Sequence, residues 1–415
     1  MYTEPRGDIV KGHLENRGKN VWLIVLELGK DDTGKRLRDT STLHGYKGQA
    51  EEEMVRLLRK ITTGTYVANS RMTVAEYLKH WLAAYAKPSV GERTYERYEG
   101  IVTQHLTPGL GRHKLAKLRP LQIQAYYAEA LESGRYRRER KSERVHSKKD
   151  DVPETVKTGL SAQTVVHHHR VLREALRQAV KWQMLSVNPA DAVQPPRAEH
   201  KEIRALDEDG TANLLRSLEG SPMCLPATVA VGTGLRRGEL LGLRWQDVDL
   251  KAGKLAVRQN LQQTRDGLLF KSPKTAKGSR SLSLMPSTVE ALRAHKRAQA
   301  ARRLEKGPAY RDHDLVLCED DGSPWSPNRF SAQWHKAMRE KGRSVRFHDL
   351  RHTHATLLLR QGTHPKVVSE RLGHATIGIT LDTYSHVLPD MQDEAAKRLD
   401  GVLAVAMGKA QNGAS

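Results

Sequence analysis

Residues 347–359 have the sequence FHDLRHTHATLLL, in which ionisable side chains stand at the start of an apolar run with helical spacing. His348 and Arg351 are three residues apart and therefore share one face of the predicted helix. An imidazole beside a permanent guanidinium cation is suited to the oxygens of a phosphodiester. The stretch thus predicts a phosphate-binding site on a helix.

A metal site is the alternative interpretation of the same residues. His348 and His352 have the i, i+4 spacing of a zinc-binding helix, and Asp349 supplies a carboxylate after the first histidine. Zinc proteases use glutamate at that carboxylate position, and the cation of Arg351 would be unfavourable beside a metal ion. We therefore favour the phosphate site and expect no metal and no other cofactor.

The chain that follows this helix carries a further histidine and a tyrosine. The segment ERLGH, residues 370–374, is typical of a helix that ends at a glycine, with His374 just beyond it. Tyr384 follows ten residues later. A single tyrosine at a helical position is usually a core or surface aromatic, so the functional interpretation of Tyr384 depends on its neighbours.

The segment TGLRRGELL, residues 233–241, predicts a turn that enters an amphipathic helix. Arg236 stands at the start of that helix, where backbone N–H groups and the helix dipole favour an anion. The alternative for Arg236 is an ordinary surface arginine next to a turn. We interpret Glu239 as a partner that orients Arg236 and not as a catalyst.

Strands and turns are predicted between these segments. Residues 254–258 are one strand, residues 259–264 continue it, Asp266 and Gly267 form a turn, and residues 280–284 are a further strand. Lys274 lies in a turn before that last strand and, taken alone, would be assigned to solvent. Lys271 and Lys277 lie close to it in the sequence.

These residue types together suit the chemistry of phosphoryl transfer. A tyrosine phenol has a pKa of about 10 and attacks a negatively charged phosphodiester slowly without help. In the absence of a metal, fixed cations and hydrogen-bond donors must meet the developing charge. The candidates for this role are the side chains of Arg236, His348, Arg351 and His374. Lys274 is the candidate general acid for the leaving oxygen, and Tyr384 is the candidate nucleophile.

Five ordered motifs resemble those of the tyrosine recombinases of the phage integrase type. The motifs are Arg, Lys, His-x-x-Arg, His and Tyr in that order, and they lie in four stretches: TGLRRGELLGLRW, PKT followed by SRSLSL, HDLRHTHATLLL, and LGHATIGITLDTYSHV. The resemblance covers roughly residues 203–400. Five motifs in the family's order make a chance coincidence remote.

The resemblance implies roles for the site residues. Arg236, His348, Arg351 and His374 would activate the scissile phosphate, Lys274 would protonate the leaving oxygen, and Tyr384 would form a 3′-phosphotyrosyl link. Lys271 and Lys277 remain alternatives to Lys274. The implied enzyme integrates or excises a mobile element such as a prophage or plasmid.

The resemblance also implies partners. They are double-stranded DNA attachment sites, further copies of the chain in a tetramer on DNA, an excisionase and a host DNA-bending protein, with no membrane. The segment from Pro389 to Gly401 has Met391, Ala395 and Leu399 at helical spacing, and Val402 continues it. We expect this segment to pack on a neighbouring protomer, the alternative being its own domain.

The predicted fold is multidomain. Residues 1–66 form a small α+β domain, a short sheet plus a helix, that resembles an arm-site DNA-binding domain. Residues 71–186 form an all-helical core-binding domain, with Thr73 and Glu76 as a capping box, Pro88 at the end of the first helix, and a charged insertion at about 134–159. A proline-rich linker (187–202), a mainly helical catalytic domain with a small sheet (203–400) and a tail (401–415) follow.

Two smaller features of the sequence invite an interpretation. Within the long helix opened by Ser161, the run His167-His168-His169 is interpreted as surface histidines, because adjacent helical residues point in different directions and cannot share one ion well. Cys224 and Cys318 are the two cysteines, and we expect both to be buried small hydrophobes without a disulfide.

Composition agrees with a nucleic-acid partner. The net charge is +21 and the pI is near 9.9, with Lys and Arg spread along the chain. No stretch approaches the roughly 18 apolar residues that cross a bilayer. Cysteine usage fits a reducing compartment, so we expect a cytoplasmic, nucleoid-associated protein.

Three other functions remain open from the sequence. One is a DNA-binding regulator that kept the fold and lost the chemistry. Another is a metal-dependent nuclease built on His348 and His352. The third is a type IB topoisomerase-like enzyme, which shares the tyrosine chemistry but relaxes DNA as a monomer.

Overall fold

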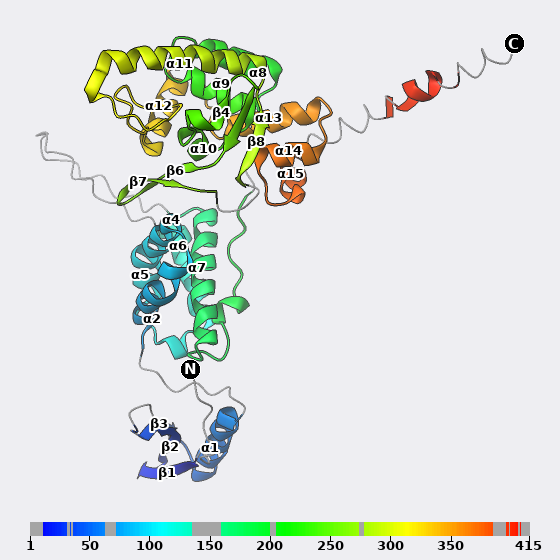
Figure 1. Cartoon of the computed structure of the whole chain (residues 1–415). Coiled ribbons are helices and arrows are strands. Elements are labelled where there is room, and N and C mark those ends of the chain that lie inside the picture. Colours follow the sequence, from blue (N-terminus) through cyan, green and yellow to red (C-terminus); the bar gives the residue numbers. More distant parts are fainter. Residues whose placement is uncertain are drawn as a thin grey trace, which may run out of the picture. The chain divides into compact units, whose positions relative to one another are not determined.

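The computed structural model describes residues 11–30, 34, 36–62, 72–134, 159–199, 205–273, 278–384, 396–397, 399–405 and 407. The chain divides into two compact units, residues 1–200 and 201–415 (Figure 1). Lys274, Lys277 and most of the charged insertion predicted at 134–159 lie outside the described residues. Within the described residues, no helix combines the length and the apolar composition needed to span a bilayer.

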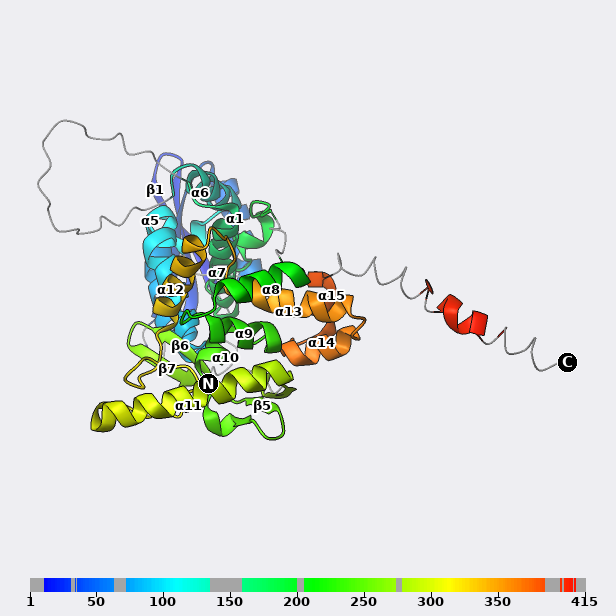
Figure 2. The same cartoon turned by 90° about the horizontal axis from the view of Figure 1, so that it is seen from above.

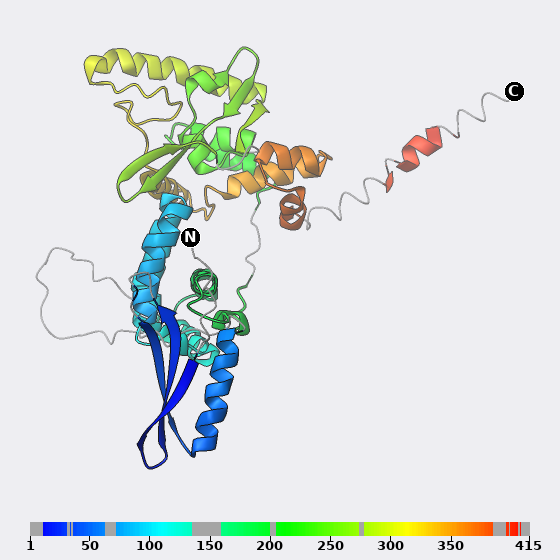
Figure 3. The same cartoon turned by 60° about the horizontal axis from the view of Figure 1, so that its bottom comes forward.

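The first 62 residues contain the predicted sheet and helix. Strands β1 (Lys11–Gly18), β2 (Val21–Lys30) and β3 (Arg36–His44) form an antiparallel meander in the order β1-β2-β3. Helix α1 (Lys47–Thr62) lies along the sheet (Figure 3). Gly12 leaves the space for that approach, since a Cβ there would lie 3.2 Å from the Met54 sulfur of α1.

The next part of the first unit is all helical. Its elements are α2 (Val74–Trp81), a π-helical segment (Leu82–Ala86), α3 (Lys87–Ser89), α4 (Glu92–Ile101), a second π-helical segment (Val102–Leu106), α5 (Thr107–Leu110), a 3₁₀ turn (Leu115–Lys117), α6 (Pro120–Ser133) and α7 (Ala162–Lys181). Thr73 and Glu76 form the predicted capping box, and Ser161 caps α7. The first helical run ends at Ser89, one residue beyond Pro88.

The prediction of surface histidines on α7 is wrong for two of the three. His168 and His169 are buried, and their Nδ1 atoms lie 2.9 Å from the hydroxyls of Tyr126 and Tyr127 respectively. Burial lowers the pKa of His168 to about 4, so its ring is neutral at pH 7. Adjacent residues of one helix thus enter the core side by side, each with its own tyrosine.

The first half of the predicted linker packs against this helical core. Pro189–Ala192 form a 3₁₀ turn, and Ala190 and Val193 are buried in the same cluster as Leu172. The turn packs against both α6 and α7 and adds apolar contacts to their core. The exact limits of the predicted domains stay a prediction.

The second unit is mainly helical with small antiparallel sheets. Its helices are α8 (Glu208–Ser217), α9 (Cys224–Thr233), α10 (Arg237–Leu241), α11 (Pro286–Lys306), α12 (Pro327–Glu340), α13 (Asp349–Arg360), α14 (Pro365–Leu372) and α15 (Ile377–Tyr384). Strands β4 (Val248–Asp249), β5 (Lys254–Val257) and β8 (Arg280–Ser283) form one sheet, and β6 (Asn260–Thr264) pairs with β7 (Gly267–Lys271).

The expectation of one continuous strand over residues 254–264 is wrong. The chain breaks after Val257, so that β5 and β6 belong to different sheets. Gln259, at the break, donates from its Nε2 to the carbonyl of Gly242, 2.9 Å away. This side-chain bond fixes the corner that the apolar pattern does not reveal.

Helix α9 forms the centre of this unit. Its residues Val229, Ala230 and Val231 are buried, and the helix packs against α8, α10, α11 and α13. Figure 2 shows α13 beside α8 and α9, with α14 and α15 at the end of the unit. A small separate cluster ties these last helices together through Leu359, Val368, Leu372 and Tyr384.

The two cysteines are free thiols, as expected, but neither is fully buried. The Cys318 side chain does not lie in a purely apolar environment, because Nε2 of Gln299 donates a hydrogen bond to its sulfur over 3.0 Å. The expectation of two buried small hydrophobes is therefore wrong.

Candidate active site

The site begins at the turn between α9 and α10. Gly234 has φ +67°, and a Cβ at this position would lie 2.7 Å from carbon atoms of His354 and Leu372. Glycine is therefore required both by the backbone conformation and by the close approach of α13 and α14. The turn places Arg236 as the N-cap residue of α10, as predicted.

Glu239 is the buried acid of the site. Its Oε1 accepts from Nη1 of Arg236 at 2.8 Å, and its Oε2 accepts from the backbone N–H of Arg236 at 2.9 Å and from Nη2 of Arg280 at 2.8 Å. Burial alone would raise the pKa of this carboxyl, but the hydrogen bond and charge of Arg280, with those of Arg236, hold the pKa at about 2. The predicted contact between Glu239 and Arg236 is present.

Arg351 is buried beneath this pair. Its Nη1 donates to the carbonyl of Gly234 and its Nη2 to that of Leu372, both over 2.7 Å. Burial, with the charge of Arg236, lowers the pKa of Arg351 to about 9, so the side chain remains a cation at pH 7. Arg351 therefore places a fixed positive charge in the interior, between the α9–α10 turn and the end of α14.

The two predicted histidines flank these cations. His374 follows Gly373, whose left-handed conformation ends α14, and its Nδ1 lies 2.8 Å from Oγ1 of Thr380. His348 is the N-cap residue of α13 and keeps an exposed side. Partial burial, with the neighbouring charges of Arg351 and Arg236, lowers the pKa of each ring to about 4. Both imidazoles are neutral at pH 7 and can donate one N–H.

Tyr384 ends α15 and is 1 % exposed. Its hydroxyl lies 2.9 Å from Nδ1 of His352, and burial raises the pKa of the phenol to about 12, against the opposing charge of Arg351. Burial also lowers the pKa of the His352 imidazole, which is thus neutral and able to accept the phenol proton. The sequence had suggested His352 only as a metal ligand.

The zinc-helix alternative finds little support in the geometry. The rings of His348 and His352 meet edge to face, with centroids 5.0 Å apart, and His352 contacts Tyr384. In the described part of the chain, no three His, Cys, Asp or Glu side chains gather as a metal-binding group.

The structure brings together five of the six predicted residues around the ends of α10, α13, α14 and α15. These are Arg236, His348, Arg351, His374 and Tyr384. Lys274 lies outside the described residues, between Pro273 and Gly278. The sequence did not identify Arg280 as part of the site, and it did not identify His352 as a partner of Tyr384. The signals available were local: Arg280 opens β8 next to the lysine turn, and His352 follows Arg351.

A groove of about 410 Å³ opens beside this cluster. Arg280, Gly373 and His374 line it, together with Lys366 and Ile377. Glu370 also lines this hollow, so that its wall carries a carboxylate beside the lysine, the arginine and the neutral histidine.

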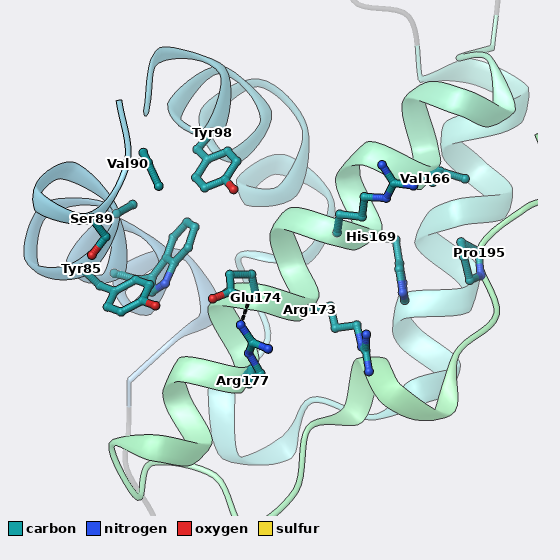
Figure 4. A pocket seen from close by; sticks show the side chains of 13 residues that line it. Tyr85, Ser89, Val90, Tyr98, Val166, His169, Arg173, Glu174, Arg177 and Pro195 are labelled. Carbon is teal, nitrogen blue, oxygen red and sulfur yellow. Dashed lines mark hydrogen bonds and ion pairs between the residues drawn. The ribbon is translucent and has the colours of Figure 1, made fainter. Parts of the chain in front are cut away.

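The helical part of the first unit has its own groove, of about 630 Å³. Tyr85 and Tyr98 lie across it from helix α7 (Figure 4). Three arginines of α7 line the other wall: Arg170, Arg173 and Arg177. Trp81 also lines it, and its buried indole N–H has no hydrogen-bond partner among the described residues. The groove therefore combines aromatic side chains with cations, and the indole N–H of Trp81 is buried behind it.

Comparison with known proteins agrees with this geometry. Residues 205–391 match the model of the phage integrase family, and residues 73–131 match that of the phage integrase N-terminal SAM-like domain. A tyrosine recombinase XerC-like protein of Caldanaerobacter subterraneus subsp. tengcongensis is 26% identical over 411 residues, 94% of this chain and 98% of that protein.

Two solved structures share the fold. The Tn1549 transposon integrase in complex with a circular intermediate DNA superposes with a TM-score of 0.64 at 18% identity, over 79% of this chain and 99% of that one. A lambda integrase tetramer bound to a Holliday junction gives 0.52 at 19%, over 88% and 95%.

The family matches, the order of the motifs and the clustered site have one consistent explanation. The chain belongs to the tyrosine recombinases of the phage integrase family. It is a site-specific DNA recombinase that cleaves and rejoins DNA strands through a phosphotyrosyl intermediate.

Proposed function

We propose that Arg236, His348, Arg351 and His374 bind and activate the scissile phosphate of double-stranded DNA, with Tyr384 as the nucleophile. The Tyr384 oxygen forms a bond to phosphorus while the bond from phosphorus to the 5′-oxygen breaks. The product is a 3′-phosphotyrosyl link and a free 5′-hydroxyl. Attack by a 5′-hydroxyl on that link reverses the step and rejoins the strand.

One observation carries this proposal. Two arginines and two neutral histidines converge on the ends of α10, α13 and α14, and the Tyr384 hydroxyl lies within the same cluster. Fixed cations and donors of this kind stabilise charge on a phosphoryl group without a metal, because their orientation is set before the substrate arrives.

Two protons must move in the cleavage step. The Tyr384 proton passes to Nδ1 of His352, which is neutral and 2.9 Å away. Lys274 supplies the proton for the leaving 5′-oxygen, and Lys271 and Lys277 are the alternatives. Because Tyr384 is 1 % exposed, attack on a DNA phosphate requires a shift of α15.

The rest of the chain supplies DNA binding. The net charge of +21 suits many phosphate contacts, and the groove of α7 offers three arginines to a DNA backbone. The sheet and helix of residues 11–62 serve as an arm-site-binding domain, and the helical domain of residues 71–186 as the core-binding domain.

We further propose assembly as a tetramer on DNA attachment sites. Leu399, Val402 and Leu403 belong to helical residues near the C-terminus and are at least half exposed, which leaves an apolar face for a neighbouring protomer. By analogy with the integrases it resembles, the enzyme integrates or excises a mobile element in the cytoplasm, at the nucleoid, with an excisionase and a host DNA-bending protein as partners.

Covalent trapping tests the proposal. A DNA site with a nick next to the scissile phosphate loses its 5′-hydroxyl fragment on cleavage, so the protein–DNA adduct accumulates. Wild type should form the adduct in EDTA, and Tyr384→Phe should form none. If the adduct requires a divalent metal, or if Tyr384→Phe forms as much as wild type, the assignment is wrong.

A second assay separates recombination from relaxation. Two duplexes with different labels should exchange strands in the presence of wild-type protein. Relaxation of supercoiled DNA without any exchange would instead favour a topoisomerase.

A further inference from the structure

The end of helix α14 is held by three arginines from three separate segments. Nε of Arg280 donates to the carbonyl of residue 371 over 2.6 Å, Nη2 of Arg351 to that of Leu372 over 2.7 Å, and Nη2 of Arg236 to that of Gly373 over 3.3 Å. These are consecutive carbonyls at a helix C-terminus, where the backbone groups lack helical partners and the dipole favours cations. The next residue is His374.

Arg280 differs from Arg236 in what its guanidinium can reach. The Arg280 side chain is 7% exposed, whereas that of Arg236 is 42% exposed. Arg280 donates to both carboxylate oxygens of Glu239, to the carbonyl of residue 371 and to that of Gly278. Its contacts lie inside the protein, while Arg236 keeps an open side for a ligand.

The contacts of Arg280 connect three parts of the site. Through Glu239 it is linked to Arg236, because both arginines share that carboxylate. Through the end of α14 it is linked to His374. Through the carbonyl of Gly278 it is linked to the residues that lead into β8.

We propose that Arg280 is a positioning residue of the recombinase, which aligns Arg236 and His374 on the scissile phosphate without contacting it. The inference rests on the proposed function of that site. A lysine cannot replace the guanidinium, since one ammonium group cannot reach two carboxylate oxygens and two carbonyls that lie around a planar fork.

The test measures single-turnover adduct formation on nicked DNA together with DNA affinity. Arg280→Lys keeps the charge but loses the geometry, so the cleavage rate should fall about 100-fold, the size of effect expected from a misplacement of about 1 Å. The dissociation constant for DNA should stay within about threefold, because the net charge is unchanged. The matched control is Arg302→Lys, a residue that pairs with the exposed Asp320, and it should cleave like wild type.

A double-variant cycle tests whether Arg280 acts through Glu239. Arg280→Lys combined with Glu239→Gln should be no slower than the slower single variant, because both changes break one unit. All proteins are assayed at one temperature, at which thermal denaturation shows each variant to be folded. Should Arg280→Lys not fold, Arg280→Gln takes its place, with the same expected loss of rate.

The outcomes separate this inference from the proposed function. An adduct that forms with wild type and not with Tyr384→Phe, while Arg280→Lys cleaves within threefold of wild type, overturns the positioning role alone. Equal losses of cleavage and DNA affinity, or multiplying losses in the double variant, also overturn it. Absence of any wild-type adduct overturns the proposed function and the inference with it.

Discussion

The arginines of the second unit and those of helix α7 are held in contrasting ways. The side chains of Arg280 and Arg351 are buried and donate to backbone carbonyls. Arg280 also donates to the carboxylate of Glu239, whose side chain is itself 7% exposed. Arg173 and Arg177 expose 58% and 60% of their side chains and pair with the surface acids Asp191 and Glu174. Both regions are basic, yet only the first has its cations fixed in the interior.

The difference matches the functions that we propose for the two regions. Stabilising charge on a phosphoryl group in the transition state requires donors oriented in advance in a site of low polarity. Binding a DNA backbone requires positive charge near phosphates, and flexible exposed side chains provide it. The same change made in both regions should therefore have very different effects.

The largest effect is expected at Arg351. Arg351→Lys leaves one of the carbonyls of Gly234 and Leu372 without its donor and moves the cation away from the site. We expect single-turnover cleavage to fall by roughly 10³-fold, the range for loss of a transition-state donor. Adduct formation on nicked DNA measures this. Retention of more than a tenth of the wild-type rate would mean that the interior cation does not serve the reaction.

The next effect is on stability and concerns Glu239. Its folded-state pKa of about 2 lies below the ordinary 4.5, so its ionised form stabilises the fold above pH 4.5, and the contribution is lost as the pH falls through about 2. Glu239→Gln should reduce the free energy of unfolding by about 3 kcal/mol at pH 7. Urea unfolding should show less than half that difference at pH 3. An equal difference at both pH values would contradict the role of the charge.

A smaller effect is expected at Arg170 of α7. This side chain is exposed and lines the groove of the helical unit. Arg170→Gln should weaken DNA binding by about threefold in 0.1 M salt and lower the slope of log K against log salt by about one. The cleavage rate at saturating DNA should not change. A changed cleavage rate with an unchanged salt slope would show that Arg170 does not belong to the DNA-binding surface.

The smallest effect is expected at Arg173. Arg173→Lys keeps an exposed cation beside Asp191, and exposed ion pairs contribute less than about 1 kcal/mol. Thermal denaturation and DNA affinity should both match wild type within error, about twofold for affinity. A loss comparable to that of Arg351→Lys would erase the contrast between the two regions.

Much of the local structure could be predicted because it depends on neighbours in the sequence. The capping box of Thr73, the cap of Ser161 and the helix-ending Gly373 all act within four residues. The order of the site motifs was likewise visible. The spacing of the apolar residues does favour burial of His168 and His169, since both fall at core positions between Val165 and Leu172.

The contacts that organise the site could not be predicted in the same way. His352 and Tyr384 are 32 residues apart, and Glu239 and Arg280 are 41 apart, so no local pattern links them. Similarly, at the split of residues 254–264 between two sheets, Gln259 donates to the carbonyl of Gly242, which is 17 residues away in the sequence. These features come from tertiary packing, which propensity and periodicity do not encode.

The burial of Tyr384, the nucleophile that we propose, makes this residue a structural member of its own helix cluster. Its ring packs with Leu359, Val368 and Leu372, and burying such a side chain stabilises a fold by roughly 1.5–3 kcal/mol. An equilibrium of that size would expose the ring in about 0.6% to 7% of the molecules. The apparent cleavage rate would then be the intrinsic rate multiplied by this small population. Packing in the core of α13 to α15 would therefore limit how often the protein cleaves DNA.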